Sequence, residues 1–285
     1  MVIKVGYLGV DEFTFGYLAM RQHFNGTEIE PVKYNTHMDI CNAVGNKKVQ
    51  LGVVAIENTL DGIVAETARA MEKAERMPGV KILGEIILPI KLYYANKSGN
   101  PSDAKKVVSH PSALGQCNYF VRELREKGVS NESRSSTSEA AKEATSDEGI
   151  AVLSSIEAIN HYGLKLLKEG SVTNHPSSAT RFWVIGKEHA DRTGDDKTCF
   201  LINLEQSKAG SLHKSLGVFA EKGVNLYVIY PISIFGKMWE YTFLVEVKGH
   251  IEDDAVSQAY DNFDKLGIAL HGMQFLGSYP NKSGI

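Results

Sequence analysis

The first two-thirds of the chain alternate short apolar strands with helical segments, and this alternation constrains the fold more than any other feature. Residues 51–56 form a continuous apolar run of strand length, which is typical of a strand covered on both faces. Residues 2–8 indicate another strand, and Thr36 is placed to cap a helix that runs to about Asn46. Repeated strand–helix units predict an α/β fold with a mainly parallel sheet, which binds ligands at the carboxyl ends of its strands.

A second lobe is expected within residues 79–177, where further strand signals occur at 107–109 and 149–153. The chain would then return to the first lobe through the apolar strand that begins near Ala179. We therefore predict one domain over residues 1–187, with lobe 1 at about 1–78 and 178–187 and lobe 2 at about 79–177. Two crossings between lobes make a hinged cleft, the arrangement of periplasmic-binding-protein-like folds.

The last part of the chain, residues 197–281, follows a polar linker and shows the order strand, helix, strand, strand, helix, strand. This βαββαβ order is the ferredoxin-like pattern. A sheet of this size leaves long edges that need protection or a partner. We therefore expect a homo-oligomer, a homodimer or homotetramer, held mainly through residues 198–280.

Composition excludes several classes of function. The 285 residues carry a net charge of −3, which argues against non-specific nucleic-acid binding. Three scattered cysteines indicate neither a disulfide framework nor a zinc site, and the histidines lack metal-ligand spacing. We expect no metal ion and no cofactor. No signal peptide and no apolar stretch of membrane-spanning length is found, so a cytoplasmic protein without a membrane partner is expected.

The segment Thr180-Arg181-Phe182 places a hydroxyl beside a guanidinium at the start of an apolar strand. Side chains alternate along a strand, so Thr180 and Phe182 should share one face while Arg181 takes the other. A hydroxyl donor beside a bidentate carboxylate binder suits a small dianionic substrate. The alternative is that Thr180 only begins a strand, that Arg181 is an edge charge, and that Phe182 belongs to the core.

Polar residues also gather where strands give way to helices, at Asn58, Thr59, Ser109, Ser136 and Thr137. Such groups bind carboxylates without adding positive charge. Each could instead be a plain helix cap, and Ser136 with Glu139 fits a capping box. His110 is either an acid or a structural residue before Pro111, and the role of Glu57 is open between orienting a ligand and supporting the fold.

Several motifs in a fixed order, together with Thr180-Arg181-Phe182, resemble the catalytic domain of prephenate dehydratases. They are Tyr7-Leu8-Gly9 with Thr14-Phe15, Gly52-Val53-Val54-Ala55-Ile56-Glu57-Asn58-Thr59, Gly84-Glu85, Ser109-His110-Pro111, Gln116-Cys117, Ser136-Thr137-Ser138-Glu139-Ala140-Ala141 and Tyr162-Gly163-Leu164. The resemblance implies conversion of prephenate to phenylpyruvate, with loss of water and carbon dioxide and no redox cofactor. It implies Thr180 as the catalytic donor to the departing hydroxyl. The expected substrate-binding residues are Arg181, Phe182, Asn58, Thr59, Ser109, Ser136, Thr137 and Thr14.

The C-terminal part resembles an ACT regulatory domain through Gly210-Ser211-Leu212, Gly223-Val224-Asn225-Leu226 and Leu276-Gly277-Ser278-Tyr279-Pro280. This resemblance implies an effector pocket, with phenylalanine as the expected ligand, at Gly210, Ser211, Leu212, Asn225 and Leu226. Phenylalanine-controlled relatives carry Glu-Ser-Arg-Pro where this chain has Tyr230-Pro231-Ile232-Ser233. We therefore expect a weakened or altered response to amino acids.

Two other functions remain open from the sequence. Arogenate dehydratase differs only in its substrate, which carries an amino group in place of the ketone of prephenate, and these residues do not separate the two enzymes. A non-catalytic amino-acid sensor with the same two domains is disfavoured by Thr180, because binding alone would not require a hydroxyl there.

Overall fold

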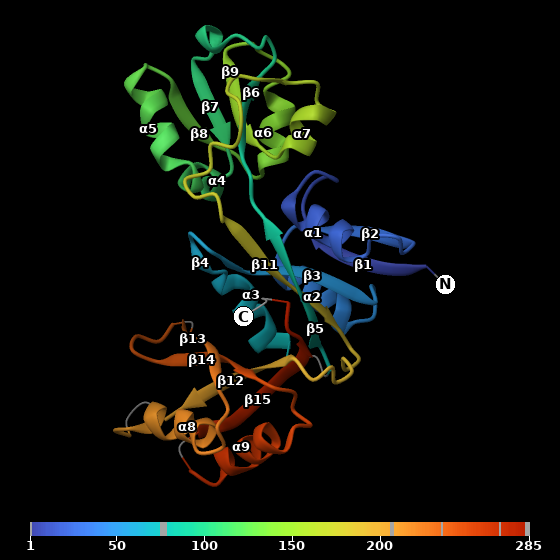
Figure 1. The fold of residues 1–285 in the computed structure, drawn as a ribbon, viewed down its shortest axis with the longest axis vertical. Coiled ribbons are helices and arrows are strands. Elements are labelled where there is room, and N and C mark those ends of the chain that lie inside the picture. The colour runs from blue at the N-terminus through green and yellow to red at the C-terminus, as the bar shows by residue number, and fades with distance from the viewer. Residues whose placement is uncertain (1, 75–78, 206–207, 235, 268, 283–285) are drawn as a thin grey trace.

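The computed structural model describes residues 2–74, 79–205, 208–234, 236–267 and 269–282, and these form three sheets stacked along one long axis (Figure 1). The two upper sheets belong to lobes 1 and 2, and the lower sheet belongs to the C-terminal domain. The α/β, two-lobed fold expected from the sequence is confirmed, as is the βαββαβ order of the last part.

Lobe 1 is built on a sheet of strand order β2-β1-β3-β11-β5, with the short β4 paired to β3. Its strands are β1 (Ile3–Leu8), β2 (Ile29–Tyr34), β3 (Leu51–Asn58), β4 (Gly62–Ile63), β5 (Lys81–Pro89) and β11 (Ala179–Gly186). Its helices are α1 (Phe15–His23), α2 (His37–Gly45) and α3 (Ala65–Ala74). Thr36 caps α2 as expected, because its side chain accepts from the Asp39 N–H.

The lobe 1 sheet is mixed, which differs from the mainly parallel sheet expected. β2, β1 and β3 are parallel, whereas β11 runs antiparallel to both β3 and β5. The reason is the hinge: the chain leaves lobe 1 along β5 and returns along β11. The Ile90 N–H donates to the Ser178 carbonyl at 2.7 Å where the two crossing strands meet. Since β5 lies in the first sheet, lobe 2 begins after Pro89, not at residue 79.

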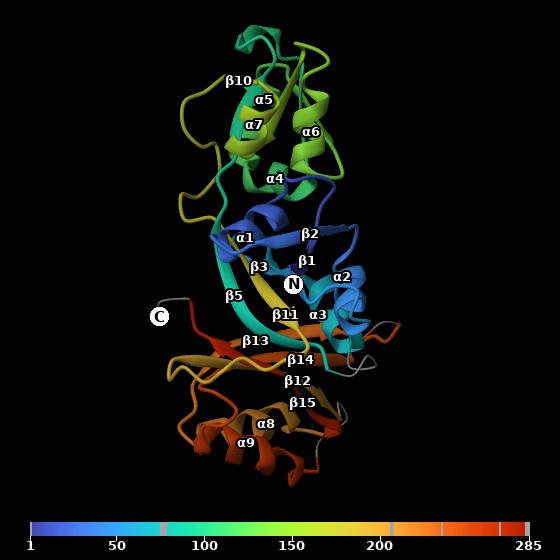
Figure 2. The same cartoon turned by 90° about the vertical axis from the view of Figure 1, so that its right-hand side faces the viewer.

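Lobe 2 has a sheet of order β10-β6-β9-β7-β8, again part parallel and part antiparallel. Its strands are β6 (Tyr93–Asn96), β7 (Lys106–Ser109), β8 (Ser130–Ser133), β9 (Ile150–Ser154) and β10 (Lys165–Leu166). Its helices are η1 (Pro101–Asp103), α4 (Pro111–Gln116), α5 (Asn118–Glu126), α6 (Thr137–Glu143) and α7 (Ile156–His161). α4 and α6 each follow a strand and begin on the side that faces lobe 1 (Figure 2).

The C-terminal domain is an antiparallel sheet of order β13-β14-β12-β15, with α8 and α9 on the face away from lobe 1 (Figure 2). Its elements are β12 (Asp196–Leu204), α8 (Ser211–Ala220), β13 (Leu226–Ser233), β14 (Tyr241–Lys248), α9 (Asp254–Asp264) and β15 (Ala269–Pro280).

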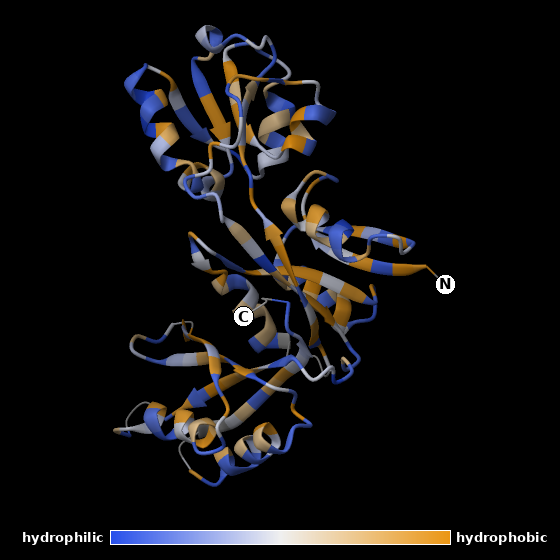
Figure 3. Ribbon diagram, in the orientation of Figure 1, coloured by the Kyte–Doolittle hydropathy of each residue, from blue (hydrophilic) through white to orange (hydrophobic). Residues whose placement is uncertain are grey.

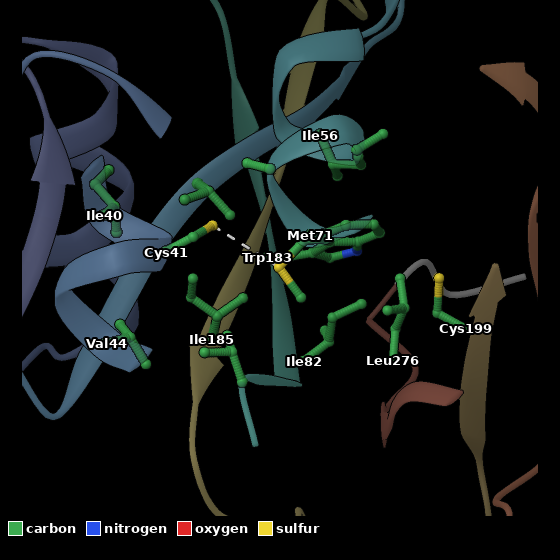
Figure 4. Close-up of a cluster of buried hydrophobic side chains, with 14 of the residues drawn as sticks. Ile40, Cys41, Val44, Ile56, Met71, Ile82, Trp183, Ile185, Cys199 and Leu276 are labelled. Atoms are coloured by element: carbon green, nitrogen blue, oxygen red, sulfur yellow. Dashed lines mark hydrogen bonds between the residues drawn. The ribbon is translucent and has the colours of Figure 1, made fainter. Parts of the chain in front are cut away.

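The free face of the C-terminal sheet packs directly on lobe 1. One buried cluster joins Trp183 and Met71 of lobe 1 to Cys199 and Leu276 of the C-terminal domain (Figure 4). Gly277 is required at this contact, because a Cβ there would collide with the Ile82 backbone of β5. Apolar colouring concentrates in the strands of lobe 1 that form this joint core (Figure 3). The C-terminal domain therefore shares a core with the back of the lobe 1 sheet.

Candidate active site

A cavity of about 670 Å³ lies between lobes 1 and 2. From lobe 1 it is lined by the ends of β1 and β3, the start of β11 and the start of α1; from lobe 2 it is lined by the starts of α4 and α6. The carboxyl ends of β1 and β3 meet the amino end of β11 here because β11 is antiparallel to its neighbours. The position agrees with ligand binding at strand carboxyl ends.

Thr180 and Asn58 form a pair on the lobe 1 side of this cavity. The Asn58 Nδ2 donates to the Thr180 Oγ1 at 2.9 Å. The Asn58 Oδ1 is held in turn by the N–H groups of Leu60, at 2.8 Å, and Asp61, at 3.2 Å. These backbone bonds fix which end of the amide faces Thr180. The Thr180 hydroxyl therefore accepts from Asn58 and keeps its own hydrogen for a ligand in the cavity.

A β-bulge in β3 is responsible for bringing Asn58 to the cavity. β11 pairs Arg181 with Glu57 but the next residue, Phe182, with Ala55, so Ile56 is the extra residue. Ala55 and Asn58 both line the cavity, whereas Ile56 lies in the core shared with the C-terminal domain. In a regular strand Asn58 would share the face of Ile56. The bulge reverses the alternation after Ile56, as bulges beside active sites often do.

Arg181 does not line the cavity, and its expected role as a substrate-binding residue is wrong on this geometry. Strand alternation turns it to the opposite face from Thr180, where its Nε donates to the Glu57 Oε2 at 3.0 Å. Its Nη1 donates to Glu246 at 2.9 Å and to Glu85 at 3.3 Å. Burial alone would lower the pKa of Arg181, but the carboxylates of Glu246 and Glu57 outweigh this effect and raise the pKa above its usual range. Arg181 is therefore a structural residue, half-buried, that forms ion pairs with carboxylates.

The remaining expected substrate-binding residues divide into two groups. Five line the cavity: Thr14, Asn58, Ser136, Thr137 and Phe182. Thr59 and Ser109 do not. The Ser109 side chain is fully buried and its Oγ donates to the Leu153 carbonyl, while the Thr59 Oγ1 accepts from the Ala179 N–H. Both hydroxyls therefore support the local fold.

The cavity-lining hydroxyls also have internal partners. The Thr14 Oγ1 donates to the Leu8 carbonyl at 3.2 Å and does not cap α1. The Ser136 Oγ accepts from the Glu139 N–H at 3.0 Å, which confirms the helix cap expected for it. His110 is the N-cap of α4, where its Nδ1 accepts from the Ser112 N–H at 3.2 Å. Burial lowers the pKa of His110, while Asp61 opposes this effect.

Sequence reasoning missed a contact that joins the two lobes. The Asp61 Oδ2, in lobe 1, accepts from the Ser112 Oγ at 2.7 Å and from the Gln116 Nε2 at 3.0 Å, both in α4 of lobe 2. All three residues line the cavity. The motif around Gln116 was visible in the sequence, but nothing there indicated its partner across the cleft.

His37 is a second residue that the sequence did not single out. It lines the cavity beside Glu66, is 4% exposed, and its Nδ1 has no hydrogen-bond partner among the described residues. Burial lowers the pKa of His37 and Glu66 opposes this effect. No Lys or Arg occurs among the residues that the structure describes along the cavity wall, so any anion there must be bound by neutral donors.

The residues expected to bind an effector lie at the start of α8, where Gly210 is the N-cap and Ser211 and Leu212 form the first turn, and at the start of β13. Gly210 adopts φ 80° at the start of the helix, and the Ser211 Oγ donates to the Lys208 carbonyl at 2.8 Å. Leu212 of α8 and Leu226 of β13 are partly buried and pack against the core of the C-terminal domain. The Asn225 carbonyl accepts from the Lys248 N–H at 2.8 Å. Within the described ranges, no cluster of metal-ligating side chains occurs. No helix there combines the length and apolar character needed to cross a membrane.

The fold and the cavity together define a two-lobed α/β protein with a cleft site for a small molecule and a ferredoxin-like domain attached to the back of one lobe. A family model described as prephenate dehydratase matches residues 5–190. The chain belongs to the prephenate dehydratase family, as the sequence motifs indicated.

Known proteins of this family are similar to the chain over nearly its whole length. A bifunctional chorismate mutase/prephenate dehydratase of Aquifex aeolicus is 34% identical over 278 residues, covering 98% of this chain and 74% of that protein. A prephenate dehydratase of Bacillus subtilis is 27% identical over 293 residues, covering 98% and 99% respectively. The crystal structure of prephenate dehydratase from Arthrobacter aurescens, in complex with L-Phe, superposes with a TM-score of 0.84 at 25% identity. The match covers 98% of this chain and 90% of that one. The enzyme class is thus a lyase acting on prephenate in phenylalanine biosynthesis, as expected.

Proposed function

We propose that this chain converts prephenate to phenylpyruvate within the interlobe cavity, with Thr180 as the donor to the departing hydroxyl. The observation that carries the proposal is the bond from the Asn58 Nδ2 to the Thr180 Oγ1 at 2.9 Å, which leaves the Thr180 hydrogen free. In the reaction the ring C–O bond breaks and the hydroxyl leaves as water after taking up one proton. The bond to the ring carboxylate also breaks, its electron pair enters the ring, and carbon dioxide departs.

Aromatisation drives the reaction, so the chain needs only to position the substrate and stabilise the leaving group. A threonine hydroxyl is a poor acid at neutral pH, so Thr180 stabilises the developing charge by a hydrogen bond and the proton itself comes from elsewhere. Interactions of this kind raise the rate only where they strengthen in the transition state. The fixed Asn58 amide favours this because it prevents Thr180 from donating to Asn58.

The substrate would be held by neutral groups of both lobes. Ser136 and Thr137 line the cavity and would donate to carboxylates from their hydroxyl groups, while Thr14, whose hydroxyl already donates to the Leu8 carbonyl, lines the cavity beside them. Phe182 lines the cavity on the same face as Thr180 and would contact the substrate ring. The Asp61 contact with Ser112 and Gln116 spans the lobes and would keep the cavity closed around the substrate. Closure would supply positioning and water exclusion together.

The C-terminal domain is proposed to be an ACT domain that binds an amino acid, with phenylalanine as the effector. The Arthrobacter aurescens structure was solved in complex with L-Phe. Gly210, Ser211, Leu212, Asn225 and Leu226 are the proposed contacts at the start of α8 and of β13. Tyr230-Pro231-Ile232-Ser233 lies within β13 and carries no charged side chain, which supports an altered response.

The chain is further proposed to act as a homodimer or homotetramer in the cytoplasm. β13 is an edge strand, since it pairs only with β14 among the described strands, and Ile229 on it is exposed. Unpaired edges of this length are usually covered. Sedimentation at micromolar concentration tests this proposal, and a monomer would contradict it.

Thr180→Ala tests the catalytic role, with Thr180→Ser as the matched control that retains the hydroxyl. Losing a donor aimed at developing charge typically costs about 10²–10³ in rate, so kcat should fall by that factor in Thr180→Ala and partly recover in Thr180→Ser. The product is measured as phenylpyruvate absorbance in alkali. Near-normal turnover in Thr180→Ala would refute the assignment.

A two-substrate assay separates the alternatives. Arogenate offered in place of prephenate would yield phenylalanine directly if the chain prefers the amino compound. A preference for arogenate would identify an arogenate dehydratase, and activity on neither substrate would identify the non-catalytic sensor.

A further inference from the structure

The face of lobe 1 behind Thr180 and Asn58 is occupied by the next residue of each strand. Arg181 follows Thr180 on β11, and Glu57 precedes Asn58 on β3. The two are register partners and form a two-pronged ion pair, with the Nε and Nη2 of Arg181 at 3.0 and 2.9 Å from the Glu57 Oε2. This pair therefore stands directly behind the Thr180–Asn58 pair, on the other side of the sheet.

The Arg181–Glu57 pair also sits at the β-bulge. The register slips by one residue immediately after Arg181 and Glu57, so Ile56 has no partner on β11. Because of that slip, Glu57 and Ile56 both turn away from the cavity and Asn58 turns toward it. A regular pairing would remove Asn58 from the cavity. The ion pair thus links β11 and β3 at the last regular pair before the bulge, and the bulge determines that Asn58 faces the cavity.

Two side chains of the C-terminal domain bind this ion pair from behind. The Tyr230 hydroxyl, on β13, donates to the Glu57 Oε1 at 3.1 Å. Glu246, on β14, accepts from the Arg181 Nη1 with both carboxylate oxygens at 2.9 Å. The Tyr279 hydroxyl donates to the same Glu246 at 2.9 Å, and neither Glu246 nor Tyr279 is exposed. Each member of the ion pair thus has a partner in the other domain.

We propose that Glu246 and Tyr230 of the C-terminal domain are positioning residues for the dehydration, acting on Thr180 and Asn58 through the Arg181–Glu57 pair. The inference rests on the proposed role of Thr180. Charged hydrogen bonds of this kind hold direction as well as distance. The bidentate Glu246 fixes Arg181 at its strand position, and Tyr230 fixes the second oxygen of Glu57 at the bulge. Tyr230 belongs to the segment that differs from the motif of phenylalanine-controlled relatives, and here it contacts Glu57 on a strand that borders the cavity.

The consequence is that the C-terminal domain takes part in the reaction without any effector bound. Loss of either contact would let the bulge relax and displace Asn58 from Thr180. Displacements of about 1 Å at a reacting group can cost about 10² in rate. Binding of substrate uses other cavity residues, so its affinity should change little.

Tyr230→Phe and Glu246→Gln are the test variants, and Glu72→Gln is the matched control. Glu72, on α3, accepts from the Thr242 Oγ1 at 2.9 Å across the same domain contact but has no bond to the residues beside Thr180. We expect kcat to fall about threefold to tenfold in Tyr230→Phe and about tenfold to a hundredfold in Glu246→Gln, with KM nearly unchanged. Glu72→Gln should keep the unsubstituted kcat.

A double-mutant cycle separates positioning from general stability. In the Thr180→Ala background there is no hydroxyl left to position, so Tyr230→Phe should cause no further fall in kcat. An equal further fall would show a merely structural role and refute the proposal. If Glu246→Gln fails to fold, the half-buried Tyr230 still gives a result through Tyr230→Phe.

The outcomes also distinguish this inference from the proposed function. Full activity in Thr180→Ala would refute the catalytic assignment and this inference with it. Loss of activity in Thr180→Ala, with unsubstituted kcat in both Tyr230→Phe and Glu246→Gln, would refute the inference alone.

Discussion

Replacement of Arg181 by methionine gives the sharpest test of its buried ion pairs. The substitution keeps an unbranched apolar stem and removes the only guanidinium that contacts Glu246 among the described residues. Glu246 is fully buried and would retain only the Tyr279 hydroxyl, whereas Glu85 would keep Lys197 at 2.9 Å. One buried carboxylate is thus left without a counter-charge.

The expected cost follows from that single uncompensated charge. Removing one partner of a buried ion pair typically costs about 3–5 kcal/mol. An unfolding entropy of about 2.1 cal/mol/K per residue over 285 residues gives about 0.6 kcal/mol per kelvin. The melting temperature should therefore fall by about 5–8 °C if the chain unfolds in one transition.

Calorimetry on Arg181→Met measures this fall, with Arg134→Met as the matched control. Arg134 also contacts two carboxylates, Glu132 and Glu143, but on the surface of lobe 2, where such pairs contribute about 0–1 kcal/mol. An unchanged melting temperature in Arg181→Met, together with a raised KM for prephenate, would refute the structural role and restore Arg181 as a substrate ligand.

Three further predictions follow from the cavity and the C-terminal domain. Burial holds the pKa of His37 below its unfolded value near 6.5, so the unfolded chain binds more protons as pH falls below about 6.5 and stability is lost there. Unfolding free energies at pH 7 and pH 5.5 should differ less in His37→Gln than in the unsubstituted chain; an equal difference would contradict this. Asp61→Ala removes the contact between the lobes and should lower kcat/KM by about tenfold, measured with prephenate, and an unchanged value would show that the contact has no role in catalysis. Activity titrated with phenylalanine, tyrosine and tryptophan, beside calorimetric binding, should show a weakened or altered response; strong phenylalanine inhibition unaffected by Tyr230→Ala would show that the changed segment matters little.

The side-chain faces of β11 could be predicted from the sequence, because alternation along one strand is a local property. Thr180 and Phe182 do share the cavity face, and Arg181 does take the other. The substrate cannot contact both faces of β11, and only the face of Thr180 and Phe182 borders the cavity. Nothing in the segment itself shows that a second domain supplies Glu246 behind Arg181, so the charge looked free to bind a ligand.

Contacts that depend on strand pairing or on the closing of the lobes could not be predicted in the same way. The bulge at Ile56 depends on how β3 meets β11, more than 120 residues later in the chain. Ser109 carries a hydroxyl at a strand end, as a binding residue would, but the neighbouring strand β9 offers the Leu153 carbonyl and takes the hydroxyl inward. Asp61 meets Ser112 only because the hinge brings α4 over lobe 1.

The two faces of the lobe 1 sheet differ in charge: one borders the cavity, and the other carries the ion pairs to the C-terminal domain. The cavity side carries no lysine or arginine among the described residues that line it, although the carboxyl groups of Asp61 and Glu66 do line it. A fixed cation there would hold the dianionic substrate as well as the transition state, and so would not raise the rate of the chemical step. The opposite side concentrates charge, with Arg181 and Lys197 set against Glu57, Glu85 and Glu246. Buried charges are costly unless every partner is in place, so a displacement that separates these partners is energetically unfavourable. If Glu246 and Tyr230 position Thr180 and Asn58 as proposed, a small change in their contacts with Arg181 and Glu57 alters the reaction rate, without any contact between the C-terminal domain and the substrate.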